Sequence, residues 1–138
     1  VDHLENMSAN DIPALKASDT IPTLLPGTSF FSNMPYGKGR AMIDAGLAVA
    51  MASDYNPGST PSGDMRFVMS LACMKMRLLP EEALNAVTIN GAAAMCQSST
   101  HGSIRRGERP GIIMTKPVPS LAFVPYAYTT PWIARTFF

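Results

Sequence analysis

The sequence predicts an α/β fold with parallel strands, and three observations support this prediction. With 138 residues, 46% of them hydrophobic, the chain has enough apolar material for one core of ordinary size. Leu47–Ser53 reads as an unbroken apolar run, as expected for a parallel strand covered on both faces. Strand-like and helix-like segments alternate along the first 96 residues, which is typical of parallel strands joined by helices.

The first half of the chain carries two helix signals and one further strand signal. Ser8–Ala17 is expected to form a short helix, because its first residue is a good cap and Asp11 follows three residues later. Thr20–Leu25 is expected to be a buried strand, closed by the Pro-Gly pair that follows it. Gly37–Asp44 is expected to form a helix that ends at Gly46 in the left-handed conformation.

The second half begins with the clearest helix signals. Asp64–Arg77 has apolar residues at the 3.6-residue period of an amphipathic helix. Pro80 opens another helix, expected to run to about Val87 and to continue in a second segment toward Met95. The remaining segments are a tight turn or hairpin at Gly102–Gly107, a short strand at Gly111–Thr115 and a proline-rich stretch without regular period at Lys116–Pro131.

The composition excludes several classes of function. A formal net charge of +1 argues against a nucleic-acid partner, because phosphate binding needs a clustered basic surface. The apolar runs fall short of the roughly 20 residues that span a bilayer, so no membrane association is expected. Cys73 and Cys96 lack metal-type spacing and are expected to be free thiols of a cytoplasmic protein.

The strongest local signal is the loop that follows the second predicted strand. Asp54 comes directly after Leu47–Ser53, and in barrel enzymes the carboxyl ends of strands point at the active site. An Asp there can bind a metal through oxygen and accept a proton from water, while Asn56, Ser59 and the N–H of Gly58 can hold a polar substrate. The pattern alone favours the alternative, a turn with an Asx-type hydrogen bond.

Two histidines are present, and neither stands in a recognisable motif. His3 lies near the beginning of the sequence, where a single histidine is more often structural than catalytic. His101 precedes a glycine in a polar loop and is expected to be exposed to solvent.

Several segments together resemble the imidazolonepropionase family of the amidohydrolase superfamily, in the family's order and at about its spacing. The match covers most of residues 1–96 and continues more weakly beyond them. The segments that carry it are Asp2-His3-Leu4, Leu24-Leu25-Pro26-Gly27-Thr28-Ser29-Phe30, Ser53-Asp54-Tyr55-Asn56-Pro57-Gly58-Ser59 and Met69-Ser70-Leu71-Ala72.

The resemblance implies the C-terminal part of a (β/α)₈ TIM-like barrel together with part of a small β-sandwich. Residues 1–96 would form the barrel part, and residues 97–138 the partial sandwich and a C-terminal tail. Val1–Leu4, Thr20–Leu25 and Leu47–Ser53 would be the sixth, seventh and eighth barrel strands.

The resemblance also implies the chemistry. The family hydrolyses the ring of 4-imidazolone-5-propanoate to N-formimidoyl-L-glutamate in histidine degradation, with one zinc or iron ion. A His-x-His pair on the first strand, a His on the fifth and an Asp ending the eighth bind the metal. Asp54 matches that Asp and is expected to be both ligand and proton carrier, and His3 matches the catalytic His. Asn56, Gly58 and Ser59 match the substrate-binding loop.

The chain also departs from the family pattern. It has no His-x-His pair and no fifth-strand His, so we expect it to be inactive alone and to bind metal weakly or not at all. Pro110 removes a backbone donor, which predicts an irregular or edge strand after it. The alternatives are another cyclic-amide hydrolase or aminohydrolase of the superfamily, and a non-catalytic fragment. Unpaired barrel edges predict self-association into a homo-oligomer.

Overall fold

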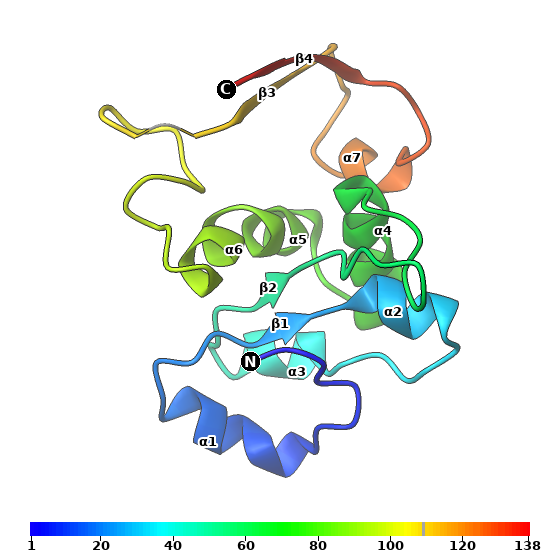
Figure 1. The fold of residues 1–138 in the computed structure, drawn as a ribbon, viewed down its shortest axis with the longest axis vertical. Coiled ribbons are helices and arrows are strands. Elements are labelled where there is room, and N and C mark those ends of the chain that lie inside the picture. The colour runs from blue at the N-terminus through cyan, green and yellow to red at the C-terminus, as the bar shows by residue number, and fades with distance from the viewer. Residues whose placement is uncertain (109) are drawn as a thin grey trace.

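The computed structural model describes residues 1–108 and 110–138 and shows an α/β arrangement around a short parallel sheet (Figure 1). Strand β1 (Thr23–Leu24) pairs with β2 (Ala50–Met51) in parallel, with Thr23 opposite Ala50 and Leu24 opposite Met51. Both strands are shorter than the sequence predicted, since the paired residues make up only two positions of each predicted strand. The predicted α/β class with parallel strands is confirmed.

The beginning of the chain lies along the other side of β1. Val1 O accepts a hydrogen bond from Thr23 N at 2.8 Å, and the amino group of Val1 donates to Ile21 O at 3.3 Å. Ala50 N and Ala52 N bond instead to Pro22 O and Leu24 O. Bonds from alternate residues point to opposite sides of a strand, so β1 lies between the first residues and β2. Residues 1–4 themselves form no strand, so the sixth barrel strand that the resemblance implied for Val1–Leu4 stays a prediction.

Helices surround this sheet, and their apolar faces form the core. The next three helices along the chain after β2 are α4 (Met65–Met76), α5 (Pro80–Val87) and α6 (Ile89–Ala94), and α5 and α6 contact β2. Before β2 the chain forms η1 (Ala9–Asp11), α1 (Ile12–Lys16), α2 (Pro26–Phe31) and α3 (Gly39–Asp44). The most deeply buried side chains include Leu24, Met42, Val49, Val68 and Leu71.

Most helix boundaries agree with the signals in the sequence. Ser8 and Asp11 form the predicted capping box, and Asp64 caps α4 by accepting a hydrogen bond from Arg66 N at 2.9 Å. Gly46 follows α3 with φ +86°, which is the left-handed conformation that glycine adopts without strain. The bounds of α5 are those predicted.

The Pro-Gly pair at 26–27 closes the predicted strand as expected and begins helix α2, because proline at a first helical position needs no N–H partner. One prediction for the loops is wrong. The stretch at 116–131 is not irregular throughout, since α7 (Phe123–Tyr126) forms one helical turn within it. Pro125 is tolerated there because the first N–H groups of a helix have no intrahelical partner.

The last part of the chain forms a second, separate sheet. Strand β3 (Ile112–Thr115) pairs antiparallel with β4 (Ile133–Phe137), and the register shifts between Met114 and Thr115. The irregularity after Pro110 agrees with the sequence, whereas β4 was not predicted. Among the described residues no helix is long and apolar enough to cross a membrane.

An ion pair joins two of the helices. Arg40 in α3 donates to both carboxylate oxygens of Glu82 in α5, at 2.7 and 2.9 Å, and to Asp44 at 2.9 Å. Glu82 also accepts from Leu79 N at 2.8 Å, so its carboxylate secures the beginning of α5 as well. The Arg40 guanidinium lowers the pKa of Glu82 below its usual value.

Candidate active site

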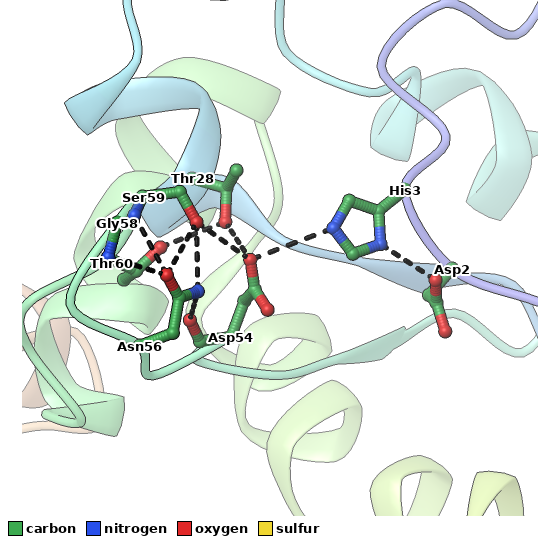
Figure 2. A network of polar contacts seen from close by, with 8 residues as sticks. All are labelled: Asp2, His3, Thr28, Asp54, Asn56, Gly58, Ser59 and Thr60. Atoms are coloured by element: carbon green, nitrogen blue, oxygen red, sulfur yellow. Dashed lines mark hydrogen bonds and ion pairs between the residues drawn. The ribbon is translucent and has the colours of Figure 1, made fainter.

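His3 and Asp54 come from separate segments and meet beyond the ends of the parallel sheet (Figure 2). His3 comes two positions after Val1, which is hydrogen-bonded to β1, and Asp54 comes three positions after the end of β2. Both have left-handed backbones, with φ of 56° for His3 and 51° for Asp54. Side-chain-bearing residues adopt this conformation at a cost, and such residues cluster where function requires a fixed direction.

The two side chains face each other without forming a short hydrogen bond. His3 Nε2 lies 3.7 Å from Asp54 Oδ2, and His3 Nδ1 lies 2.7 Å from Asp2 Oδ1. The imidazole is 54% exposed and the Asp54 carboxylate 24% exposed, so both can be reached by a ligand. The hydrogen bond with Asp2 and the charge of Asp54 raise the pKa of His3. Because a carboxylate only accepts, Nδ1 carries a proton, and Nε2 faces Asp54.

The two oxygens of Asp54 have different surroundings. Oδ2 accepts hydrogen bonds from Thr28 Oγ1 at 2.7 Å and Ser59 Oγ at 3.3 Å. Within residues 1–108 and 110–138, no side chain or backbone N–H donates to Oδ1. One oxygen is therefore held by the protein while the other remains available.

The loop after Asp54 is organised by Asn56. Its Oδ1 accepts hydrogen bonds from the backbone N–H groups of Gly58 and Ser59, both at 2.9 Å. Its Nδ2 donates to Asp54 O at 2.7 Å and to Ser59 Oγ at 2.9 Å. This is the Asx turn that the pattern alone favoured. Since these groups already have partners, their role in substrate binding stays a prediction.

The Asp54 carboxylate fits the role of one metal ligand, but the chain alone does not complete a metal site. No group of three or more His, Cys, Asp or Glu side chains that could hold a metal gathers among the described residues. A closed zinc site takes four ligands, and a catalytic one takes three from the protein. The free Oδ1 of Asp54 is a suitable oxygen ligand, and His3 Nε2 lies 3.7 Å from the other oxygen, Oδ2.

A large cavity lies beside β2 rather than around these two residues. It has a volume of about 1130 Å³ and is lined mostly by β2, α5, α6 and the segments 101–104 and 110–113. Asp2 and Ser53, the neighbours of His3 and Asp54, line its edge, but His3 and Asp54 themselves do not. His101 is exposed, as predicted, and its Nδ1 lies 2.8 Å from Thr100 Oγ1.

Sequence reasoning did not assign a role to Thr28 or Thr60. The structure places the Thr28 hydroxyl 2.7 Å from Asp54 and 2.9 Å from the Thr60 hydroxyl. Thr28 stands in one of the segments that carried the family resemblance, which was the only signal for it. Its contact with Asp54 joins residues 26 positions apart, and local patterns give no information about such a pair.

Comparisons with known proteins place this geometry in context. The model of the amidohydrolase family matches residues 4–137. An imidazolonepropionase of Flavobacterium johnsoniae is 56% identical over 128 residues, which is 93% of this chain and 31% of that protein. An imidazolonepropionase of Christiangramia forsetii is 54% identical over 130 residues, which is 94% of this chain and 32% of that protein.

Among solved structures, an adenosine deaminase from Xanthomonas campestris with bound zinc has a similar fold. Its TM-score is 0.83 at 18% identity, with 91% of this chain and 32% of the other covered. The chain thus spans about a third of the length of the curated relatives that it matches.

Proposed function

Because the chain belongs to the amidohydrolase family, we propose that it is part of an imidazolonepropionase, a hydrolase that opens the ring of 4-imidazolone-5-propanoate to give N-formimidoyl-L-glutamate. The observation that carries this proposal is the 56% identity to a curated imidazolonepropionase across 93% of the chain. The approach of His3 and Asp54, which follow the two segments on either side of β1, supports it.

The proposed position in the complete protein follows from the strand order. The first residues, β1 and β2 would be the sixth, seventh and eighth strands of a barrel, and β3 and β4 part of a small sandwich. The parallel hydrogen bonds on both sides of β1 support this placement. The boundary near residue 96, a homo-oligomeric state and a cytoplasmic location belong to the same proposal.

We assign the ring opening to Asp54 and His3. A zinc or iron ion, when bound, supplies a Lewis acid and makes hydroxide available near neutral pH. Asp54 would hold this ion through its free Oδ1, with the other ligands coming from segments outside this chain. The Asp54 carboxylate would also take the proton of the attacking water and pass it to the leaving ring nitrogen. The adenosine deaminase with a similar fold was solved with bound zinc, which supports a metal ion in the complete protein.

His3 would act on the oxygen of the scissile ring amide. Its Nδ1–H is held by Asp2, which fixes the ring so that Nε2 faces the space next to Asp54. When Nε2 carries a proton, its N–H can stabilise the negative oxygen that forms during attack. Asn56, Gly58 and Ser59 would bind the polar substrate beside these groups.

The test compares the complete protein with the isolated 138-residue chain. The complete protein should convert 4-imidazolone-5-propanoate to N-formimidoyl-L-glutamate, measured by chromatography, and should retain one metal ion per chain after dialysis. The isolated chain should do neither, because one carboxylate and one imidazole are too few to hold the ion.

The same assay separates the alternatives. Release of ammonia from a purine or pyrimidine ring, without turnover of imidazolonepropionate, would identify an aminohydrolase of the same family. Turnover and stoichiometric metal in the isolated chain would contradict the proposal that the chain holds only part of the site.

A further inference from the structure

We propose that Thr28, supported by Thr60, is a positioning residue that fixes the Asp54 carboxylate so that Oδ2 is held and Oδ1 is presented to the reaction. This inference rests on the proposed function of Asp54 as metal ligand and proton carrier. It assigns a supporting role to the hydroxyl groups of Thr28 and Thr60, which no sequence motif indicates.

The two hydroxyls form a chain of hydrogen bonds with a defined direction (Figure 2). Thr28 Oγ1 lies 2.7 Å from Asp54 Oδ2, and an ionised carboxylate can only accept, so Thr28 donates its proton there. Thr28 Oγ1 must then accept in its 2.9 Å contact with Thr60 Oγ1. The proton order is therefore Thr60 to Thr28 to Asp54.

Burial makes this arrangement rigid. Thr28 is 6% exposed and Thr60 3% exposed, so water does not readily replace either partner. A hydrogen bond from a hydroxyl to a charged acceptor is short and strong, and loss of its donor leaves a partly buried charge without compensation. The orientation of Asp54 thus depends on a side chain from helix α2.

Gly27 explains why Thr28 comes so close to the loop of Asp54. A methyl group at Gly27 would lie 2.9 Å from Thr60 Cγ2, closer than packed atoms normally approach, and 3.4 Å from Ser53 O. The absence of a side chain therefore lets the beginning of α2 pack directly against the segment after β2. Gly27 thus allows the close approach, and Thr28 supplies the hydroxyl that donates a hydrogen bond to Asp54.

The other groups near Oδ2 are weaker anchors. Ser59 Oγ is 3.3 Å away and also lies 3.2 Å from Asn56 Oδ1, so its single proton has two competing acceptors. His3 Nε2 lies 3.7 Å away, beyond a hydrogen bond. Among the described residues, Thr28 is the one short, buried donor to this carboxylate.

The experiment uses the complete protein and four variants, with the Zn²⁺ dissociation constant from chelator competition, kcat on imidazolonepropionate and the thermal midpoint as readouts. Thr28→Val keeps the shape but removes the donor, and should weaken Zn²⁺ binding and lower kcat by ~10 to 100-fold each. Thr28→Ser restores the hydroxyl and should return both values close to wild type. Thr60→Val should cause a smaller loss, because Thr28 can still donate.

Thr88→Val is the matched control, since it also removes a threonine hydroxyl, one that donates to Leu84 O at 2.7 Å, and it should change neither value. Wild-type Zn²⁺ affinity and kcat in Thr28→Val would overturn the inference. So would a Thr28→Ser variant as impaired as Thr28→Val, because the methyl packing would then matter rather than the hydroxyl. If the wild-type protein turned over a different substrate, the proposed function would be refuted but this inference would not. The Zn²⁺ dissociation constants of the variants would still decide whether Thr28 positions Asp54.

Discussion

β1 and β2 are parallel and almost entirely buried, whereas β3 and β4 are antiparallel and almost entirely exposed. Leu24 in β1 is 1% exposed, and Met51 in β2 is 4% exposed. In the other pair, Ile113 is 58% exposed and Phe137 is 46% exposed. Similar apolar residues therefore have opposite environments in the parallel pair and in the antiparallel pair.

The difference explains where the candidate site lies. Buried strands have little freedom, so residues placed just beyond them, such as Asp54, point in fixed directions. The antiparallel pair contributes no residue to the site and leaves apolar side chains uncovered. A sheet face of this kind is normally covered by a further layer of structure. We therefore expect the antiparallel pair to be covered in the complete protein.

The largest effect on stability is expected in the parallel pair. Leu24→Ala in the complete protein should lower the free energy of unfolding by about 2 to 5 kcal/mol, because it leaves a cavity in the core. Leu79→Ala is the matched control, since Leu79 is 58% exposed, and should change it by about 0.5 kcal/mol or less. Urea unfolding measures both, and equal losses would show that β1 is not at the centre of the core.

A smaller effect is expected in the antiparallel pair. Ile113→Ala in the complete protein should cost on the order of 2 kcal/mol if other strands cover this sheet. Ile104→Ala, at a position that is 77% exposed in a loop, is the control and should cost much less. An Ile113→Ala variant as stable as wild type would mean that the sheet faces solvent, against the proposed sandwich.

What the sequence could predict differs between the same two regions. Ser8, Asp64 and Gly46 are local signals, because the hydrogen bonds or backbone angles that they set involve neighbouring residues, and the structure agrees with each. In the antiparallel region, β4 was missed because an exposed strand has no buried face to give it an apolar pattern.

The candidate site shows the same limit. Asp54 was found because a carboxylate directly follows an apolar run, and the family resemblance drew attention to His3. Their approach to 3.7 Å, and the Thr28 donor, depend on strand order and on the close approach at Gly27. Such contacts are set by tertiary packing, which no local pattern contains.

The smallest expected effect is the change with pH in the stabilisation that the Arg40–Glu82 ion pair contributes. Arg40 lowers the pKa of Glu82 below 4.5, so its contribution to stability is present above that pH and is lost as pH falls through the lowered value. Glu82→Gln should therefore have a lower free energy of unfolding than wild type at neutral pH, and this difference should shrink in acid. Glu81→Gln, on the exposed side of α5, is the control. A Glu82→Gln difference that does not shrink in acid would contradict this reasoning.

The metal content of two variants of the complete protein tests most directly whether this chain supplies a ligand and a neighbouring catalytic group. Asp54 is assigned to the metal and His3 to the reacting oxygen beside it. Asp54→Ala should therefore lose most of its metal after dialysis, while His3→Ala should keep a content near wild type even though its kcat falls by ~10² to 10⁴. If His3→Ala lost the metal and Asp54→Ala kept it, the assignment of the two residues would be wrong.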